Sequence, residues 1–149
     1  MQSRLLFIVM TLVLGAILPI QAAINTRLSK SVGGSIPAAF VSFAVGTIAL
    51  FIYLMATRQV NLQHVSLQQT PWWIWTGGLL GTFFVAGIVA VLPRLGTVLA
   101  FSLVLAGQMF AAIILDHFGW LGVSVREISL GRIAGVILLI ISVVMIRKF

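Results

Sequence analysis

Five long apolar stretches dominate this chain of 149 residues. Each is roughly 20 residues long, which is the length that a helix needs to cross the hydrocarbon core of a bilayer. They cover residues 5–24, 36–57, 72–92, 98–118 and 125–146. Only 7% of all residues are charged, against about 25% in soluble domains. We therefore expect an all-α integral membrane bundle of five transmembrane helices. It forms a single domain over residues 1–149, with no soluble catalytic domain.

The first stretch follows Arg4 and must be compared with a cleaved secretory signal. Cleavage after Ala23 would place Gln21 where a small residue is required, and cleavage after Ala22 would place Ile20 there. The stretch is also longer than a usual signal core. We therefore expect it to be retained as a transmembrane helix.

Cap and turn residues predict where the second and third helices begin and end. Ser35 and Pro37 suit the start of the second helix, and Thr70–Pro71 suits the start of the third. Pro93 is expected to end the third helix. Residues 25–35 and 58–71 are then loops.

The fourth and fifth helices are joined by a short connection. Gly119 is expected to close the fourth helix. Ser124 and Glu127 have the spacing of a capping box, which predicts that the fifth helix starts near Val125. That start gives the fifth helix enough length to span if Arg132 extends to the interface. Loops at 93–97 and 119–124 complete the prediction.

The positive charges are almost equally divided between the two membrane faces. With five spans, the side of the N-terminus (side A) carries four Lys or Arg residues and the other side (side B) five. Those of side A are Arg4, Arg58, Arg126 and Arg132, and those of side B are Arg27, Lys30, Arg94, Arg147 and Lys148. Orientation follows the Lys/Arg bias, so copies inserted both ways and paired as an antiparallel dimer are expected. The alternative is that a partner or a dominant first helix fixes one orientation.

The tryptophans agree with an antiparallel arrangement. Trp72, Trp73, Trp75 and Trp120 all fall at side-A helix ends. Tryptophan prefers the headgroup level of the bilayer. An antiparallel pair would restore an aromatic belt on both sides, in a two-chain version of the inverted repeat of many transporters.

Polar amides inside the apolar stretches are candidates for substrate binding. Gln21 and Asn25 are four residues apart and share a helix face, and Gln108 is the deepest strongly polar residue of its stretch. Gly15 and Pro19 predict a helix break beside them, because Pro19 cannot donate to the Gly15 carbonyl. The alternative role for all three amides is interhelical hydrogen bonding.

Asp116 and His117 are the candidates for proton or ion coupling. Asp116 is the only acidic residue within an expected span other than Glu127, which the capping box explains. Acids inside a membrane are functional by default, and histidine titrates near neutral pH. The alternative is an interfacial ion pair of Asp116 with Arg126 or Arg132.

Seven glycines are expected to allow close helix packing, because small residues let backbones approach one another in membranes. They are Gly46, Gly77, Gly78, Gly81, Gly107, Gly131 and Gly135. Dimer contact or a moving gate is the more specific version of this role.

Several function classes find no support in the sequence. The chain has no Cys, and the spacing of His64, His117 and Asp116 matches no metal-ligand pattern. It has no nucleophile elbow, no His-Glu metal motif and no phosphate-binding glycine loop followed by Lys. The charges form no basic cluster. We expect no enzymatic activity, no metal, no cofactor and no nucleic-acid partner.

The combined motifs resemble the YdcZ-like family, a bacterial inner-membrane exporter family within the drug/metabolite transporter superfamily. They run over nearly the whole chain as Gln21-x-x-x-Asn25, Phe43-x-x-Gly46, Pro71-Trp72-Trp73-x-Trp75-x-Gly77-Gly78-x-x-Gly81, Gly107-Gln108 and Leu115-Asp116-His117-Phe118-Gly119. The resemblance implies a multi-pass protein of the bacterial inner membrane. It also implies that a five-helix subunit works as an antiparallel dimer, with itself or with a homologous subunit.

The family looks distantly related to the small multidrug resistance exporters, which use a Glu in their first helix for proton and cation exchange. Here the first helix has no acid and offers Gln21 instead. If protons are coupled, Asp116 is the obvious carrier within a span.

Two classes of function follow from the sequence. The first is a secondary transporter in which two antiparallel copies form a cavity lined by Gln21, Asn25 and Gln108. The shortage of buried charge favours a neutral, zwitterionic or weakly charged hydrophobic solute, whose identity the residues do not define. The second is a non-transporting membrane subunit, or half of an obligate heterodimer. A passive channel is less favoured, because no helix carries a repeated row of polar residues. Membrane lipid is a partner in every case.

Overall fold

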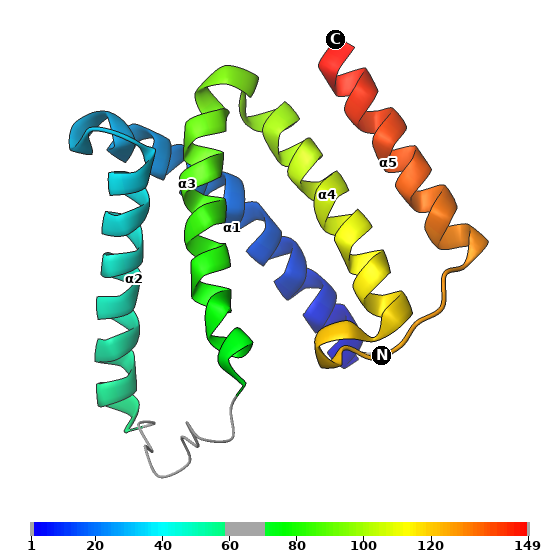
Figure 1. Ribbon diagram of the computed structural model, residues 1–149, viewed down its shortest axis with the longest axis horizontal. Coiled ribbons are helices and arrows are strands. Elements are labelled where there is room, and N and C mark those ends of the chain that lie inside the picture. Colours follow the sequence, from blue (N-terminus) through cyan, green and yellow to red (C-terminus); the bar gives the residue numbers. More distant parts are fainter. Residues whose placement is uncertain (1, 59–70, 149) are drawn as a thin grey trace. The chain divides into compact units, whose positions relative to one another are not determined.

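The chain is all-helical in its computed structural model, which describes residues 2–58 and 71–148 (Figure 1). Five α-helices are long and apolar enough to cross a membrane, as the sequence predicted. They are α1 (Gln2–Val32), α2 (Ser35–Thr57), α3 (Gly77–Leu95), α4 (Thr97–Phe118) and α5 (Leu130–Lys148), with short 3-10 helices η2 (Trp72–Thr76) and η3 (Trp120–Gly122). Thr70, with its predicted cap, and His64 lie outside the described residues.

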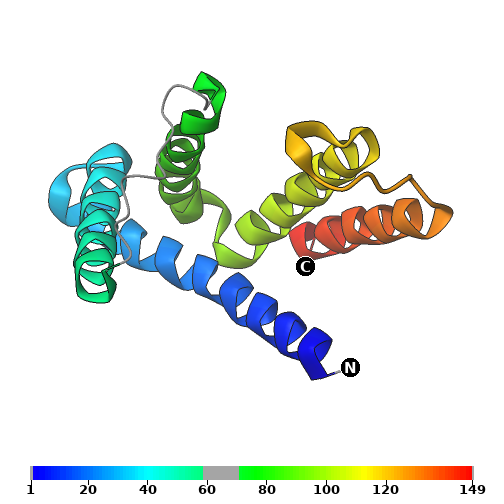
Figure 2. The ribbon, with the colours of Figure 1, turned by 90° about the horizontal axis from the view of Figure 1, so that it is seen from below.

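The helices form two compact units, Met1–Arg94 and Leu95–Phe149. The first unit holds α1, α2 and almost all of α3, and the second holds α4 and α5 (Figures 1 and 2). In each unit two consecutive helices pack directly on one another, α1 on α2 and α4 on α5. Most large apolar side chains are exposed on the outside of these helices. Such surfaces suit lipid or a second protein copy, since lipid tails are as apolar as leucine.

Helix α1 is longer than predicted. It continues to Val32 instead of ending near residue 24, so most of the expected loop at 25–35 is helical. At 1.5 Å per residue its 31 residues extend about 46 Å, beyond a ~30 Å hydrocarbon core. The expected break at Gly15 and Pro19 does not interrupt the helix. One missing N–H is tolerated because the remaining helical bonds persist on both sides of the proline.

A two-glycine turn reverses the chain between α1 and α2. Gly33 has φ 85°, and the N–H of Gly34 donates to the carbonyl of Ser29 over 2.8 Å. This is the bond of a Schellman motif, which ends a helix at a residue with positive φ. Gly34 rather than Ser35 then precedes α2, with no side-chain cap, so the predicted Ser35 cap is wrong.

Small side chains hold α1 and α2 close together near this turn. Ala22 of α1 and Ala38 and Ala39 of α2 are buried. Alanines at a helix crossing let the two backbones approach closely, as in other membrane helix pairs. This crossing fixes the register of the polar residues that follow on both helices.

Helix α3 begins and ends differently from the prediction. The chain enters it through η2, with Pro71 before the first turn. Pro93 lies inside α3 and does not end it, because the helix runs on to Leu95. A proline in the last turn removes only one backbone bond. The buried face of α3 consists of Val85, Ile88, Val89 and Leu92, the spacing of one helix face.

The connection from α4 to α5 is also different from the prediction. Gly119 closes α4 in the left-handed conformation, as predicted. Residues 123–129 are not helical, so the capping box at Ser124 and Glu127 is wrong and α5 begins at Leu130. The physical reason is that the N–H of Arg126 donates to the Asp116 carbonyl over 2.8 Å. Ser129 takes the capping role, accepting a bond from the N–H of Arg132 over 3.4 Å.

Candidate functional site

A groove between α1 and α2 brings one of the predicted amides together with two hydroxyl groups. It has a volume of about 230 Å³. Its walls combine polar and apolar side chains from both helices: Gln21, Ser42, Phe43, Gly46, Thr47 and Leu50. Ser42 and Thr47 lie seven and twelve residues after the start of α2 at Ser35, about 10 and 18 Å along its axis. The groove therefore lies at the level of the membrane interior, where polar groups are costly.

The two hydroxyls of this groove differ from other hydroxyls in the helices. Thr11, Thr26, Thr57, Thr82 and Ser102 each donate to the carbonyl four residues earlier, over 2.8–3.0 Å. Ser42 and Thr47 make no hydrogen bond within the described part of the chain. The groove thus contains two hydroxyls and an exposed amide, all able to donate and accept.

Asn25 lies one helical turn beyond Gln21, at the α1–α2 crossing. Only 4% of its surface is exposed, and its Nδ2 is buried without a partner among the described residues. A buried, unpaired polar group costs about 1–3 kcal/mol. Asn25 does not line the groove itself, so the structure separates the two amides into an open one and a buried one. Sequence spacing alone assigned both to the same face.

Gln108, the third predicted amide, lies on α4 in the other compact unit. Its side chain is exposed, and it lines neither of the two grooves between α4 and α5. Its role in binding stays a prediction.

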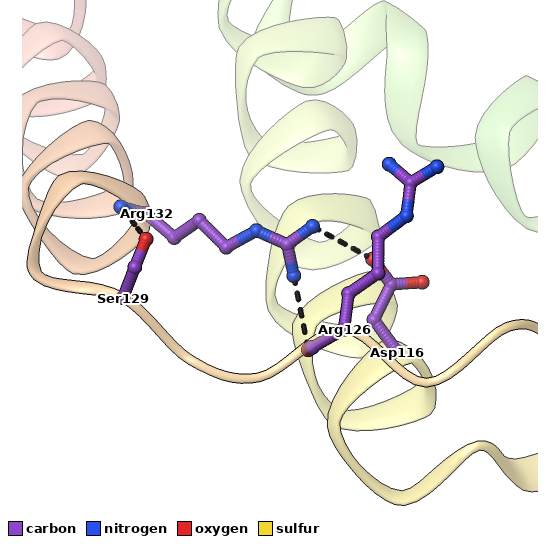
Figure 3. A network of polar contacts seen from close by, with 4 residues as sticks. All are labelled: Asp116, Arg126, Ser129 and Arg132. Carbon is purple, nitrogen blue, oxygen red and sulfur yellow. Dashed lines mark hydrogen bonds and ion pairs between the residues drawn. The ribbon is translucent and has the colours of Figure 1, made fainter.

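Asp116 forms an ion pair with Arg132, 3.3 Å between Oδ2 and the guanidinium (Figure 3). The same guanidinium donates to the carbonyl of Arg126 over 3.2 Å. Together with the bond from the Arg126 N–H to the Asp116 carbonyl, these contacts fasten the start of α5 to the end of α4. The interfacial ion pair considered as the alternative for Asp116 is therefore present. Its side chains are about one-third exposed, 34% for Asp116 and 30% for Arg132.

His117 has aromatic neighbours, whereas Asp116 is paired with an arginine. Its Nδ1 is buried without a partner among the described residues. Its ring meets the ring of Phe118 edge-on, with centroids 4.8 Å apart, and Phe118 stacks on Trp120. The two candidate coupling residues thus have separate neighbours. Within the described residues no group of three or more acidic or histidine side chains could hold a metal ion.

An apolar groove between α4 and α5 was missed by the sequence reasoning. It has a volume of about 510 Å³ and ends at the Asp116–Arg132 ion pair. Its α4 wall includes Leu105, Met109 and Ala112, at helical spacing. That spacing is visible in the sequence, but helices that are apolar all round do not reveal which face meets a neighbour.

The predicted packing glycines have different environments. A Cβ at Gly81 would lie 3.4 Å from the ring of Phe43, so α3 contacts α2 there. Gly46 and Gly135 line the grooves of the two units. The other four would meet no described atom within 4 Å: Gly77, Gly78, Gly107 and Gly131. Any close packing of these four must therefore involve something outside the described contacts.

Comparison with known proteins gives two matches. The family model described as "Putative inner membrane exporter, YdcZ" matches residues 6–145. The "Inner membrane protein YdcZ" of Escherichia coli (strain K12) is 26% identical over 132 residues, which cover 88% of this chain and 87% of that protein. No solved structure gives a significant match.

Proposed function

We propose a function from one premise: the chain belongs to the YdcZ family, and it is a multi-pass protein of the inner membrane. The proposal is that it is a secondary transporter of the drug/metabolite transporter superfamily that exports a small solute. Two copies with opposite orientations would form the working unit. The groove of Gln21, Ser42 and Thr47 is the observation that carries this proposal.

The groove supports solute binding because its polar groups have no hydrogen-bond partner among the described residues, at a depth in the membrane where such groups need one. Unpaired polar groups in a membrane face a cavity or another polar group. The Gln21 amide and the hydroxyls of Ser42 and Thr47 offer donors and acceptors beside the apolar Phe43 and Leu50. None of the described residues that line this groove is charged. A neutral or zwitterionic solute with one hydrogen-bonding group and an apolar body fits this chemistry.

Two features support the antiparallel dimer: glycines that no described residue packs against, and the nearly equal division of positive charges between the two membrane faces. Gly77, Gly78, Gly107 and Gly131 are open to a close neighbour, and small residues are preferred at membrane helix contacts. The Lys and Arg residues divide four to five between the two sides. In such a dimer the two copies would exchange roles, so that the inward-open and outward-open states are mirror images. Gln108 of each copy would reach the shared cavity.

Cysteine labelling tests the arrangement, because the chain has no Cys of its own. One variant carries a Cys after Phe149 and a second carries a Cys before Arg4. Intact cells are treated with a membrane-impermeant maleimide, and again after permeabilisation. We expect each end to be labelled to about half in intact cells. Labelling of only one end would overturn the homodimer and require an oppositely oriented partner.

Transport itself is tested in proteoliposomes with three fluorescent amphiphiles, one neutral, one zwitterionic and one cationic. We expect the neutral or zwitterionic probe to move, and Gln21→Leu to abolish that movement without changing dimer formation. The control is Thr82→Val, which removes a polar group outside the groove whose hydroxyl already donates to the carbonyl of Gly78 over 3.0 Å. Movement of none of the probes by an intact dimer would count against the transporter.

The alternative function is a non-transporting subunit, or one half of an obligate heterodimer. The open glycines suit this function equally well. It predicts that Gln21→Leu and Gln108→Leu preserve the activity of the assembly. Loss of activity in a correctly assembled variant would rule it out.

A further inference from the structure

The second unit has another apolar groove at the opposite end of the α4–α5 pair from the Asp116–Arg132 ion pair. Its volume is about 490 Å³. Seven apolar residues and one arginine line it: Leu95, Leu99, Leu103, Ala106, Ile140, Val143, Val144 and Arg147. We call it the Arg147 groove. Neither the proposed transport site nor the coupling candidates use it.

The dimensions of the Arg147 groove match one leaflet of a bilayer. Its α4 wall runs from Leu99, in the first turn of α4, to Ala106. Ala106 lies nine residues after the start of α4 at Thr97, about 14 Å along the helix axis. Half of a ~30 Å hydrocarbon core is about 15 Å. The groove therefore begins near the interface and ends close to the middle of the membrane, a depth that suits a single acyl chain.

Within the described part of the chain, no acidic side chain compensates the charge of the Arg147 groove. Arg147 is exposed in the last turn of α5, and no described residue forms an ion pair with it. The groove at the other end of the helix pair is different, because its Arg132 is neutralised by Asp116. Of the two grooves, only the Arg147 groove combines an apolar wall with a net positive charge at headgroup level.

We propose that the Arg147 groove binds an anionic phospholipid. One acyl chain lies between α4 and α5, and the guanidinium of Arg147 contacts the headgroup phosphate. Arginine suits this contact because its planar fork matches phosphate oxygens and because it extends readily to the interface. Lipid binding at this groove does not depend on transport, so this proposal is independent of the proposed function.

Native mass spectrometry of the full chain in detergent tests the proposal, with dioleoylphosphatidylglycerol as the anionic probe and dioleoylphosphatidylcholine as the zwitterionic one. We expect the anionic lipid to bind about five-fold more tightly, the effect of one basic side chain at an anionic headgroup. Arg147→Gln should abolish this preference and leave binding of the zwitterionic lipid unchanged. Arg27→Gln is the control, since it removes the same charge at the end of α1 and outside the groove.

A second pair of variants tests the apolar wall. Ala106→Phe narrows the groove and should reduce the binding of both lipids, whereas Ala111→Phe, on an exposed position of α4 outside the groove, should not. Equal binding of both lipids by the wild type would overturn the proposal, as would equal effects of Arg147→Gln and Arg27→Gln. Displacement of the anionic lipid by inorganic phosphate would show a headgroup site without a chain site, and would overturn it too. Disulfide formation between copies at Leu103→Cys, with no lipid bound, would assign the groove to a second copy instead.

Discussion

Asn25 is the residue whose substitution best separates function from packing. Its Nδ2 is buried without a partner among the described residues, so it costs stability within one copy. Replacing it by an apolar residue of similar size removes that cost. We therefore expect Asn25→Leu to leave the free energy of unfolding unchanged or raised by about 1 kcal/mol. Solute movement should fall, because the amide one helical turn beyond Gln21 is no longer available to a solute that enters from the groove. Denaturation by SDS in mixed micelles measures the free energy of unfolding, and the proteoliposome assay measures solute movement.

The control for this prediction is Thr26→Val on the next residue. The Thr26 hydroxyl already donates to the carbonyl of Ala22 over 2.8 Å, so it is not available to a solute. Transport should survive this change. A loss of about 1 kcal/mol or more in Asn25→Leu would contradict our interpretation, because it would show that the amide has a partner in the assembled protein.

Gly119 and Gly122 form a natural pair for testing the turn after α4. Both have positive φ, 63° and 82°, which costs an L-residue about 1–2 kcal/mol. A Cβ at Gly119 would also lie 2.6 Å from Cγ2 of Val125, whereas one at Gly122 would meet no described atom within 4 Å. We expect Gly119→Ala to destabilise by more than about 2 kcal/mol, and Gly122→Ala by about 1 kcal/mol. SDS unfolding of both variants checks the order, and equal losses would contradict the contact with Val125.

The connection between α4 and α5 depends on the Asp116–Arg132 ion pair. Because both side chains are about one-third exposed, the pair is worth at most about 1 kcal/mol. Asp116→Asn should therefore cost no more than that, and the loss should shrink at high salt. The double variant Asp116→Arg with Arg132→Asp should recover part of it. A much larger loss, unaffected by salt, would mean that the pair is more deeply buried in the assembly.

The same variants separate structure from coupling. If Asp116 only fastens α5, transport in the Asp116→Asn variant should keep its dependence on a pH gradient. If Asp116 carries protons, that dependence should disappear while the probe still binds. Measurements of probe movement with and without an imposed gradient decide between the two roles.

The number and type of the helices could be predicted because length and apolarity alone determine whether a segment spans a bilayer. Their ends were less predictable. Pro93 and the Ser124–Glu127 box carry local signals, but a proline is tolerated in a last turn, and the Asp116 carbonyl competes for the Arg126 N–H. That competition arises between residues ten positions apart, which no local capping rule includes.

The candidate site was partly predictable, because the sequence shows which residues are polar but not which helix faces meet. Gln21 and Asn25 are conspicuous as amides in an apolar stretch. Ser42 and Thr47 were missed because hydroxyls in helices usually bond back to their own backbone, as Thr11 and Ser102 do here. Their availability depends on α2 crossing α1 at Ala38 and Ala39, and helices that are apolar all round do not reveal this contact face.

The orientation of the chain in the membrane should be easy to change. Side B exceeds side A by only one positive charge. Two lysines added after Phe149 should raise that excess to three and place the C-terminus in the cytoplasm in nearly every copy. The C-terminal Cys would then escape the impermeant maleimide in intact cells. Half-labelling that persists despite the added charge would show that orientation is not set by the Lys/Arg bias.

This change of orientation also tests the dimer. If the working unit is an antiparallel pair of identical chains, the lysine-tagged chain should be inactive alone, because it has no oppositely inserted copy. A second variant, with Arg27, Lys30 and Arg94 all changed to Gln, leaves side B with only Arg147 and Lys148 and should insert the other way. Co-expression of the two should restore probe movement, since each supplies the orientation that the other lacks. Full activity of the lysine-tagged chain on its own would show that one orientation suffices, and the antiparallel dimer would be wrong.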